Sequence, residues 1–229
     1  MLGAIQKIFR GLGYDVVRTP NAYDFLKSRD VDLVLDVGAN RGQYARSLRE
    51  MGYSGRIHSF EPIKAVYDEL SSGASPDAKW DVSNFAVGSA PGSADINVSR
   101  NTVYSSIHSS TPMIADFSYK SAVVRVETVQ VITLDQFVKT DAKAIFLKID
   151  TQGYEREVLM GARDLVSRCV GLQLELPVEH LYNNVWSFND ALAFVSDLGF
   201  VPAQFRMVNP LHDDKAAGIE FDCIFRRKR

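Results

Sequence analysis

The sequence predicts an α/β fold in which a doubly wound sheet of roughly seven strands is mostly parallel and ends in an antiparallel strand. Short apolar segments typical of strands alternate with amphipathic segments typical of helices along most of the chain. The segment 31–37 is apolar almost throughout, as in a strand covered by helices on both faces. The last two strands, 200–208 and 219–225, are separated only by a short turn at 210–218, which favours antiparallel pairing.

The composition is that of an ordinary globular protein. The chain has 229 residues, of which 46% are hydrophobic, and its formal net charge is −2. This length fits one large domain whose core needs no disulfide or metal. The small net charge provides no general attraction to nucleic acid, so we expect no nucleic-acid partner. No apolar stretch approaches the roughly 18 residues that cross a bilayer, so we expect no integral membrane segment.

The two cysteines, Cys169 and Cys223, lie far apart in apolar stretches. Their spacing matches neither a zinc site nor a redox pair. We therefore predict two buried, inert thiols. Sparse use of cysteine is typical of a reducing compartment, which favours a cytoplasmic location.

The sequence predicts a helical segment at residues 1–30, which precedes the main domain at 31–229. A second short helix is expected within it, at 24–28. The simplest expectation for the leading helix is that its apolar face packs on the body. The alternatives are a lid over a pocket and a helix that touches a membrane. The apolar side chains that recur at helical spacing are Leu2, Ile5, Phe9 and Leu12.

Most of the remaining elements alternate regularly. Up to residue 90, the sequence predicts helices at 44–51 and 63–70 and strands at 56–60 and 79–85. From residue 134 on, it predicts helices at 134–138, 154–167 and 188–198 and strands at 144–150 and 169–176. With right-handed crossovers the strands lie parallel, and ligands of such sheets bind outside their carboxyl ends.

A small β-hairpin insertion interrupts the alternation. Its strands are expected at 94–98 and 123–132, with a long polar loop at 99–121 between them. A loop of this length in a compact domain is usually functional or disordered. We therefore examine this segment together with the ends of the strands.

The first strand ends in a turn that contains glycine, from Gly38 to Gly42. Glycines allow a tight turn and a close approach to a ligand. The dinucleotide fingerprint G-x-G-x-x-G would need glycine at 38, 40 and 43, but Asn40 and Gln43 stand there. The looser G-x-G-x-G pattern of S-adenosylmethionine (SAM) sites finds two of its three glycines. Asp36 could bind the ammonium group of SAM directly or through water.

Glu61, at the end of the second strand, is a candidate ribose ligand, because its carboxylate can accept hydrogen bonds from both ribose hydroxyls. The alternative is a surface acid that caps the next helix, with Pro62 in the first turn. Adenine needs an apolar slot with a polar group at its edge. After the third strand, Asn84 could supply that polar group, and Ala86 or Val87 the apolar wall.

Asp150 stands at the end of the strand at 144–150, which we expect in the middle of the sheet beside the first strand. Burial and neighbouring charges tune a carboxylate strongly at such a position. Gly153 permits a close backbone approach, and Glu155 lies in the first turn of a helix, where acids are favoured. Glu175 follows on the same rim. A divalent metal held by Asp150 and Glu175 is an alternative, but paired acids at strand ends also arise without metal, and we expect none.

Six blocks of sequence occur in an order that resembles the FkbM-type methyltransferases: LDVGANRGQY, SFEP, NFAVG, VITLD, LKIDTQGYE and LQLELPVEH. The resemblance covers roughly residues 31–182. It implies a SAM-dependent O-methyltransferase with the Rossmann-like fold of class I SAM methyltransferases, acting on hydroxyls of sugars, polysaccharides or polyketide-type natural products. By motif, and with the strand-end reasoning above, it assigns cofactor binding to Asp36, Gly38, Asn40, Gly42, Tyr44, Glu61, Pro62, Asn84, Ala86, Ser105, Ser106, Asp150 and Gly153.

Methyl transfer to a hydroxyl needs a base, because an alcohol is a poor nucleophile. The candidates are Asp150, His180 and His108, in this order. We expect Asp150 nearest to the transferred methyl group. His180 has the more suitable ordinary pKa, about 6.5, and His108 lies on the insertion that could close over the substrate. For each histidine the alternative is a side chain without a role in the reaction.

Two other functions compete with a methyltransferase. An NAD-dependent oxidoreductase could use a similar sheet, but the missing fingerprint glycines argue against it. A methyltransferase-like module could also bind SAM without turnover. The partner we expect is a small molecule or glycan that carries a hydroxyl group, and we also consider a homodimer.

Overall fold

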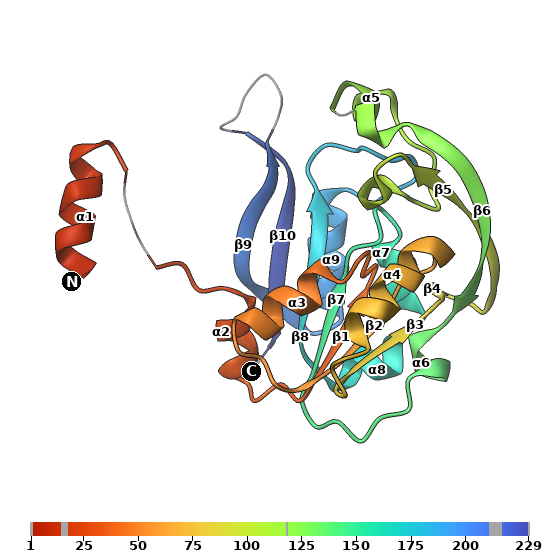
Figure 1. Ribbon diagram of the computed structural model, residues 1–229, viewed down its shortest axis with the longest axis horizontal. Coiled ribbons are helices and arrows are strands. Elements are labelled where there is room, and N and C mark those ends of the chain that lie inside the picture. Colours follow the sequence, from red (N-terminus) through yellow and green to blue (C-terminus); the bar gives the residue numbers. More distant parts are fainter. Residues whose placement is uncertain (1, 15–17, 118, 211–216, 229) are drawn as a thin grey trace.

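A seven-stranded sheet forms the centre of the protein (Figure 1). The computed structural model describes residues 2–14, 18–117, 119–210 and 217–228. Across the sheet the order is β3 (Trp80–Ser83), β2 (Arg56–Phe60), β1 (Leu33–Val37), β7 (Ile145–Ile149), β8 (Cys169–Pro177), β10 (Gly218–Arg227) and β9 (Phe200–Pro210). Neighbours from β3 to β8 pair in parallel, and β10 runs antiparallel to β8 and β9. The predicted sheet is confirmed, and residues 211–216 of the predicted turn lie outside the described residues.

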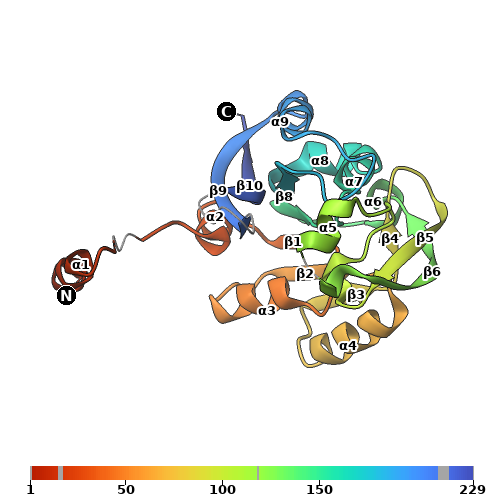
Figure 2. The same ribbon diagram turned by 90° about the horizontal axis from the view of Figure 1, so that it is seen from above.

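Helices cover both faces of this sheet (Figure 2). One face carries α2 (Ala22–Lys27), α3 (Gln43–Glu50) and α4 (Lys64–Ala74), and the other carries α6 (Leu134–Phe137), α7 (Glu155–Met160), α8 (Arg163–Arg168) and α9 (Phe188–Asp197). Successive side chains of a strand point to opposite faces. The central strands β1 and β7 are therefore buried on both sides, which is why they are apolar almost throughout.

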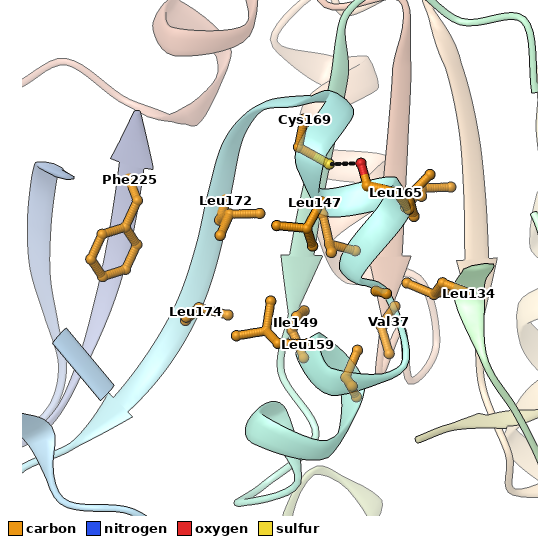
Figure 3. Close-up of a cluster of buried hydrophobic side chains, with 14 of the residues drawn as sticks. Val37, Leu134, Leu147, Ile149, Leu159, Leu165, Cys169, Leu172, Leu174 and Phe225 are labelled. Atoms are coloured by element: carbon orange, nitrogen blue, oxygen red, sulfur yellow. Dashed lines mark hydrogen bonds between the residues drawn. The ribbon is translucent and has the colours of Figure 1, made fainter. Parts of the chain in front are cut away.

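The larger core lies between the sheet and the helices α6 to α9 (Figure 3). Val37, Ile149 and Leu174 come from the three adjacent strands β1, β7 and β8. They pack with Leu134 and Leu159, which come from the helices. These strand residues lie near the carboxyl ends, so the core supports the edge of the sheet at which ligands are expected.

The two cysteines are free and buried, as predicted. The thiol of Cys169 donates a hydrogen bond to the carbonyl oxygen of Leu165 at 3.4 Å (Figure 3). Burial raises the pKa of Cys169 to about 12, so that the thiol stays protonated and unreactive at neutral pH.

The insertion forms a second sheet, in which β6 (Val123–Ile132) lies between β4 (Ala86–Val87) and β5 (Gly92–Ser99). β5 and β6 pair antiparallel, which confirms the predicted hairpin. The strand predicted at 79–85 ends earlier, at Ser83, because the chain then leaves the first sheet and β4 pairs with β6 instead. The loop between β5 and β6 contains three short helices: η1 (Thr102–Tyr104), α5 (Pro112–Phe117) and η2 (Tyr119–Ser121).

The helix predicted at 154–167 is divided into α7 and α8, which meet at Gly161 and Ala162. At this point the chain passes close to the insertion. A Cβ atom on Gly161 would lie 2.0 Å from the carbonyl oxygen of Gly88, so only glycine fits there. The contact that divides the helix comes from a distant segment, and the helical periodicity of the sequence does not reveal it.

The leading helix α1 (Leu2–Gly11) stands apart from the sheet in both views (Figures 1 and 2). Its side chains Ile5, Ile8 and Phe9 are 43%, 65% and 41% exposed, so the expected packing on the body is not observed. By contrast, α2 buries Phe25 and Leu26 against the sheet. The division into 1–30 and 31–229 and the lid hypothesis remain predictions. Among the described residues, no helix has both the length and the apolar character required to cross a membrane.

Candidate active site

A cavity opens at the carboxyl edge of the sheet, where β1, β2 and β7 end. It encloses about 660 Å³, including the space at its open mouth. The insertion covers one side with Val103, Ser105 and Ile107. The predicted site residues that line the cavity are Gly38, Asn40, Glu61, Pro62, Ala86, Ser105 and Asp150.

Gly38 brings the turn after β1 into contact with the end of β7. Its φ is 74°, and a Cβ atom would lie 1.8 Å from the carbonyl oxygen of Asp150. Any other residue would therefore separate the two loops. The neighbouring Asn40 also has a positive φ, 46°, which asparagine tolerates better than most residues. Both residues line the cavity.

Glu61 is almost completely buried, at 4% exposure. Its Oε2 accepts the backbone N–H of Asn40 and its Oε1 accepts that of Ile63, each at 2.9 Å. Burial raises the pKa of Glu61 to about 7, although these two N–H groups act in the opposite direction. A carboxylate can accept about four hydrogen bonds, so Glu61 retains acceptor capacity toward the cavity.

Asn84 supports the turn after β2. Its amide nitrogen donates to the carbonyl oxygens of Glu61 and Pro62, both at 2.9 Å. Asn84 itself does not line the cavity, whereas the following residues Phe85 and Ala86 do. The structure thus places its side chain behind the acid, as a support for the turn.

Asp36 points to the sheet face covered by α3 and is fully buried. Its Oδ1 lies 3.1 Å from Nζ of Lys148, and its Oδ2 accepts a hydrogen bond from Ser59 at 3.2 Å. Burial alone would lower the pKa of Lys148, but the carboxylates of Asp36 and Asp150 raise it well above its ordinary value. Lys148 also donates to the carbonyl oxygen of Gly38 at 3.2 Å, so the ion pair holds the turn from below.

Gly42 and Tyr44 lie away from the cavity. Gly42 has a φ of 82° and packs against Leu70 and Trp80, where a Cβ atom would come within 2.8 Å of both side chains. The hydroxyl of Tyr44 donates to Oε1 of Gln173 at 2.9 Å, on the face covered by α3. Both residues thus pack against neighbouring elements beside the turn, and neither of them lines the cavity.

Asp150 is the one of the three candidate bases that lines the cavity. Its side chain is 38% exposed, its Oδ2 lies 3.4 Å from Nζ of Lys148, and its Oδ1 accepts a hydrogen bond from Gln152 at 3.0 Å. The same Gln152 nitrogen donates to Glu175 at 2.7 Å. The nitrogen of Gln152 thus lies between Asp150 and Glu175, where the alternative of a bound divalent metal would require a cation.

The two histidines are placed differently. His108 packs its ring against Tyr154, with ring centroids 5.5 Å apart, and Tyr154 in turn lines the cavity. Within the described residues, Nε2 of His108 is buried without a hydrogen-bond partner. His180 is exposed on the segment after β8, and its carbonyl oxygen accepts a hydrogen bond from Thr111.

The serine pair and Gly153 complete the predicted set. Ser105 lines the cavity and accepts the backbone N–H of Ser99 at 3.1 Å. Ser106 donates to the carbonyl oxygen of Gln152 at 2.6 Å. Gly153, with a φ of 101°, faces an adjacent hollow, where a Cβ atom would lie 2.5 Å from Val185. These residues attach the insertion and the segment after β8 to the loop that follows β7.

Sequence reasoning missed three polar residues of this site. Lys148 had a visible signal, a lysine within an otherwise apolar buried strand. Gln152 stands in the LKIDTQGYE block, where the prediction includes Asp150 and Gly153 but leaves Gln152 out. Thr102 carries no signal in the sequence: its Oγ1 accepts hydrogen bonds from Asn40 at 3.1 Å and from Arg41 at 3.0 Å, and this contact exists only because the insertion folds over the turn.

The residues around the cavity fit SAM. The cofactor carries a sulfonium and an ammonium group, which the carboxylates of Glu61 and Asp150 complement, whereas a diphosphate would be repelled by them. The free acceptor capacity of Glu61 suits ribose hydroxyls. Phe85, Ala86 and Val87 offer an apolar wall to adenine.

Comparisons with known proteins agree with this fit. A family model described as the methyltransferase FkbM domain matches residues 36–202. The fold is similar to an rRNA methylase from Streptococcus thermophilus, with a TM-score of 0.51 and 14% identity over 93% of this chain and 99% of that one. It is also similar to magnesium protoporphyrin IX methyltransferase from Synechocystis with bound SAM, with a TM-score of 0.50 and 11% identity over 99% and 96%. These likenesses show the fold alone, and no curated protein matches the sequence.

Proposed function

The chain belongs to the FkbM methyltransferase domain family and is a SAM-dependent methyltransferase, and on this premise we propose that it methylates a hydroxyl oxygen of a sugar, polysaccharide or other natural product. The family assignment argues against the two alternative functions, an NAD-dependent oxidoreductase and a module that binds SAM without turnover. The observation that carries the proposal is the convergence of Gly38, Asn40, Glu61 and Asp150 on one cavity at the carboxyl edge of the sheet.

The cofactor would lie along the ends of β1, β2 and β7. Glu61 would bind the ribose hydroxyls, Phe85 and Ala86 would hold adenine, and the turn at Gly38 and Asn40 would face the amino-acid part. Bound there, SAM supplies a methyl group that its sulfonium activates. The proposed cofactor-binding set also includes Pro62, Ser105 and Asp150 in the cavity wall. The remaining members lie behind or beside that wall: Asp36, Gly42, Tyr44, Asn84, Ser106 and Gly153.

Asp150 is the base that we propose for the acceptor hydroxyl. It is the acid that both lines the cavity and remains partly exposed, so an acceptor can reach it. Lys148 beside it keeps a positive charge next to the carboxylate. The carboxylate would accept the proton that the hydroxyl loses as the oxygen attacks. His108, which packs behind Tyr154, and His180, which is exposed, rank below it for reasons of position.

An RNA acceptor is the second candidate, because one protein of similar fold is an rRNA methylase. The net charge of −2 favours the uncharged hydroxyl acceptor, because RNA binding rests largely on positive charge. A cytoplasmic location and a homodimer also remain part of the proposal, the first supported by two free cysteines.

The acceptor can be identified with SAM that carries an isotope-labelled methyl group. The protein is incubated with labelled SAM and separate glycan, small-molecule and RNA fractions of an extract, and labelled products are identified by mass spectrometry. We expect label on a hydroxyl oxygen in a glycan or small-molecule fraction. The matched control is Asp150→Ala, which should lose methyl transfer because it removes the proposed base. Label on nitrogen or carbon, or in RNA alone, would contradict the proposal.

A further inference from the structure

Gln152 occupies a special position two residues after Asp150. It is a non-glycine residue with a φ of 55°, in the left-handed region that most side chains avoid. Its side chain lies where the main cavity meets the adjacent hollow, and it lines both. A strained backbone at the edge of a site persists only when surrounding contacts hold it in place.

The amide of Gln152 joins two acids. Its Nε2 donates to Oδ1 of Asp150 at 3.0 Å and to Oε2 of Glu175 at 2.7 Å. An amide nitrogen carries two hydrogens, so both are used by the two carboxylates. The end of β7 and the rim of β8 are therefore linked through this one side chain.

The other polar atoms of Gln152 are held as well. The hydroxyl of Tyr182 donates to Oε1 at 2.9 Å, and the hydroxyl of Ser106 donates to the backbone carbonyl oxygen at 2.6 Å. Tyr182 is 4% exposed and Ser106 is 2% exposed, so neither contact is open to competition from bulk water. The amide is thus oriented by the segment after β8 and by the insertion.

We propose that Gln152 is a positioning residue for methyl transfer, which directs the carboxylate of Asp150 into the cavity by holding it together with Glu175. The inference rests on the proposed function of Asp150 as the base. The two N–H groups stabilise both carboxylates in their ionised form and in one relative orientation. Without them, the two acids would repel each other and would bind a proton more tightly, and an Asp150 that holds a proton cannot accept another one.

Other charged groups face this pair from each element packed against it. Glu175 is surrounded mainly by acids, and burial together with Asp150 raises its pKa well above the ordinary value. Two positive charges oppose these acids: Lys148, which pairs with both Asp36 and Asp150, and Arg206, which pairs with Asp222. The acids come from α7 and β10: Glu155, Glu220 and Asp222. In such surroundings the amide of Gln152 is the neutral donor that lies between Asp150 and Glu175 and contacts both.

The test compares the protein with Gln152→Met, which preserves the length of the side chain and removes the donors. The carboxyl carbons of Asp150 and Glu175 are titrated by 13C NMR in the complex with S-adenosylhomocysteine. We expect the first of the two protons to bind at a pH higher by about 1 unit, a tenfold change in proton affinity. With the acceptor, we expect kcat to fall about 10-fold or more, with the acidic limb of its pH profile shifted upward and KM for SAM unchanged within about twofold.

Tyr182→Phe is the second variant. It retains both N–H groups of Gln152 and removes the contacts of the Tyr182 hydroxyl with Oε1 of Gln152 and with the carbonyl oxygen of Tyr104. We therefore expect the same upward shift of the titration, but a smaller one. If Gln152→Met does not fold, this variant decides. An unshifted carboxyl titration overturns the inference, even if the thermal midpoint falls. A shifted titration with full activity of Asp150→Ala instead overturns the role of Asp150 as the base, so that the two failures are distinguishable.

Discussion

The carboxylate of Glu61 accepts the backbone N–H of Asn40 at 2.9 Å, across 21 positions of sequence. This contact ties the turn after β1 to the acid after β2. Glu61 therefore anchors the turn and, in our proposal, binds the ribose of the cofactor. These two roles of Glu61 can be distinguished by mutation and by the pH dependence of binding and stability.

Replacement of Glu61 by alanine should weaken SAM binding by about 1–3 kcal/mol, the scale of a lost hydrogen bond to a charged group. Isothermal titration calorimetry measures this directly. Glu50→Ala, at an exposed position at the end of α3, should leave the affinity unchanged. Wild-type affinity in Glu61→Ala would remove Glu61 from the ribose site.

SAM binding should strengthen as the pH rises from about 5.5 to about 8 and then level off, because burial raises the pKa of Glu61 to about 7 and the ionised form is the better acceptor. Binding of a cation should lower this pKa, so protons should be released near pH 7. Calorimetry in two buffers with different ionisation enthalpies detects the release. It should be smaller in Glu61→Gln, and equal release in both proteins would assign the protons to another group.

The same pKa has a consequence for folding. Since the pKa of Glu61 is raised from 4.5 to about 7 in the folded protein, its contribution to stability is fully present below pH 4.5 and is lost as the pH rises through 7. Between pH 4.5 and pH 8, the free energy of unfolding of the wild type should therefore fall relative to that of Glu61→Gln. Urea unfolding at several pH values measures the difference, and a constant difference would contradict the shift.

Gly38→Ala should destabilise the protein by about 3 kcal/mol or more, because its Cβ atom would overlap the carbonyl oxygen of Asp150 and its φ is positive. The matched control is Gly92→Ala at the start of β5, where no atom lies within 4 Å of the added Cβ and no strain is expected. Thermal unfolding of both variants checks the prediction. Equal midpoints would show that the loops at Gly38 and Asp150 can separate at little cost.

Lys148→Met should cost about 3–5 kcal/mol of stability, because it leaves the fully buried carboxylate of Asp36 without its charged partner. The double variant Asp36→Asn/Lys148→Met removes both charges and should recover part of this loss. Denaturant unfolding of the two proteins gives the comparison. A double variant less stable than Lys148→Met would mean that the pair contributes more than the avoidance of an unpaired charge.

Removal of residues 1–14 should leave the thermal midpoint and the SAM affinity unchanged, because α1 stands apart from the sheet and exposes its apolar side chains. The matched contrast is Phe25→Ala in α2, which should lower the free energy of unfolding by about 3–5 kcal/mol. Phe25 packs against Phe146 with 5.4 Å between ring centroids and is 3% exposed. A fall in SAM affinity after the truncation would support the lid hypothesis for the leading helix.

Much of this fold could be predicted from local patterns. Strand alternation and apolar runs identify β1 and β7, and the βα order implies that their carboxyl ends share one edge. This is sufficient to bring Gly38, Glu61 and Asp150 together, because residues that follow neighbouring parallel strands lie at the same edge of the sheet. The spacing of the glycines in the turn after β1 also disfavours a dinucleotide ligand.

Tertiary structure decided the direction of the side chains and the contacts between distant segments. Asp36 is the penultimate residue of β1, and Asp150 directly follows the adjacent strand β7. Asp36 nevertheless pairs with Lys148 on one face of the sheet, whereas Asp150 lines the cavity. Ser106 meets Gln152 only because the insertion folds back over the first sheet. Such contacts depend on how loops close over long distances, and residue order contains no local signal for that closure. The sequence by itself therefore determined which strand ends carry the chemistry, while packing decided which of their side chains enter the cavity.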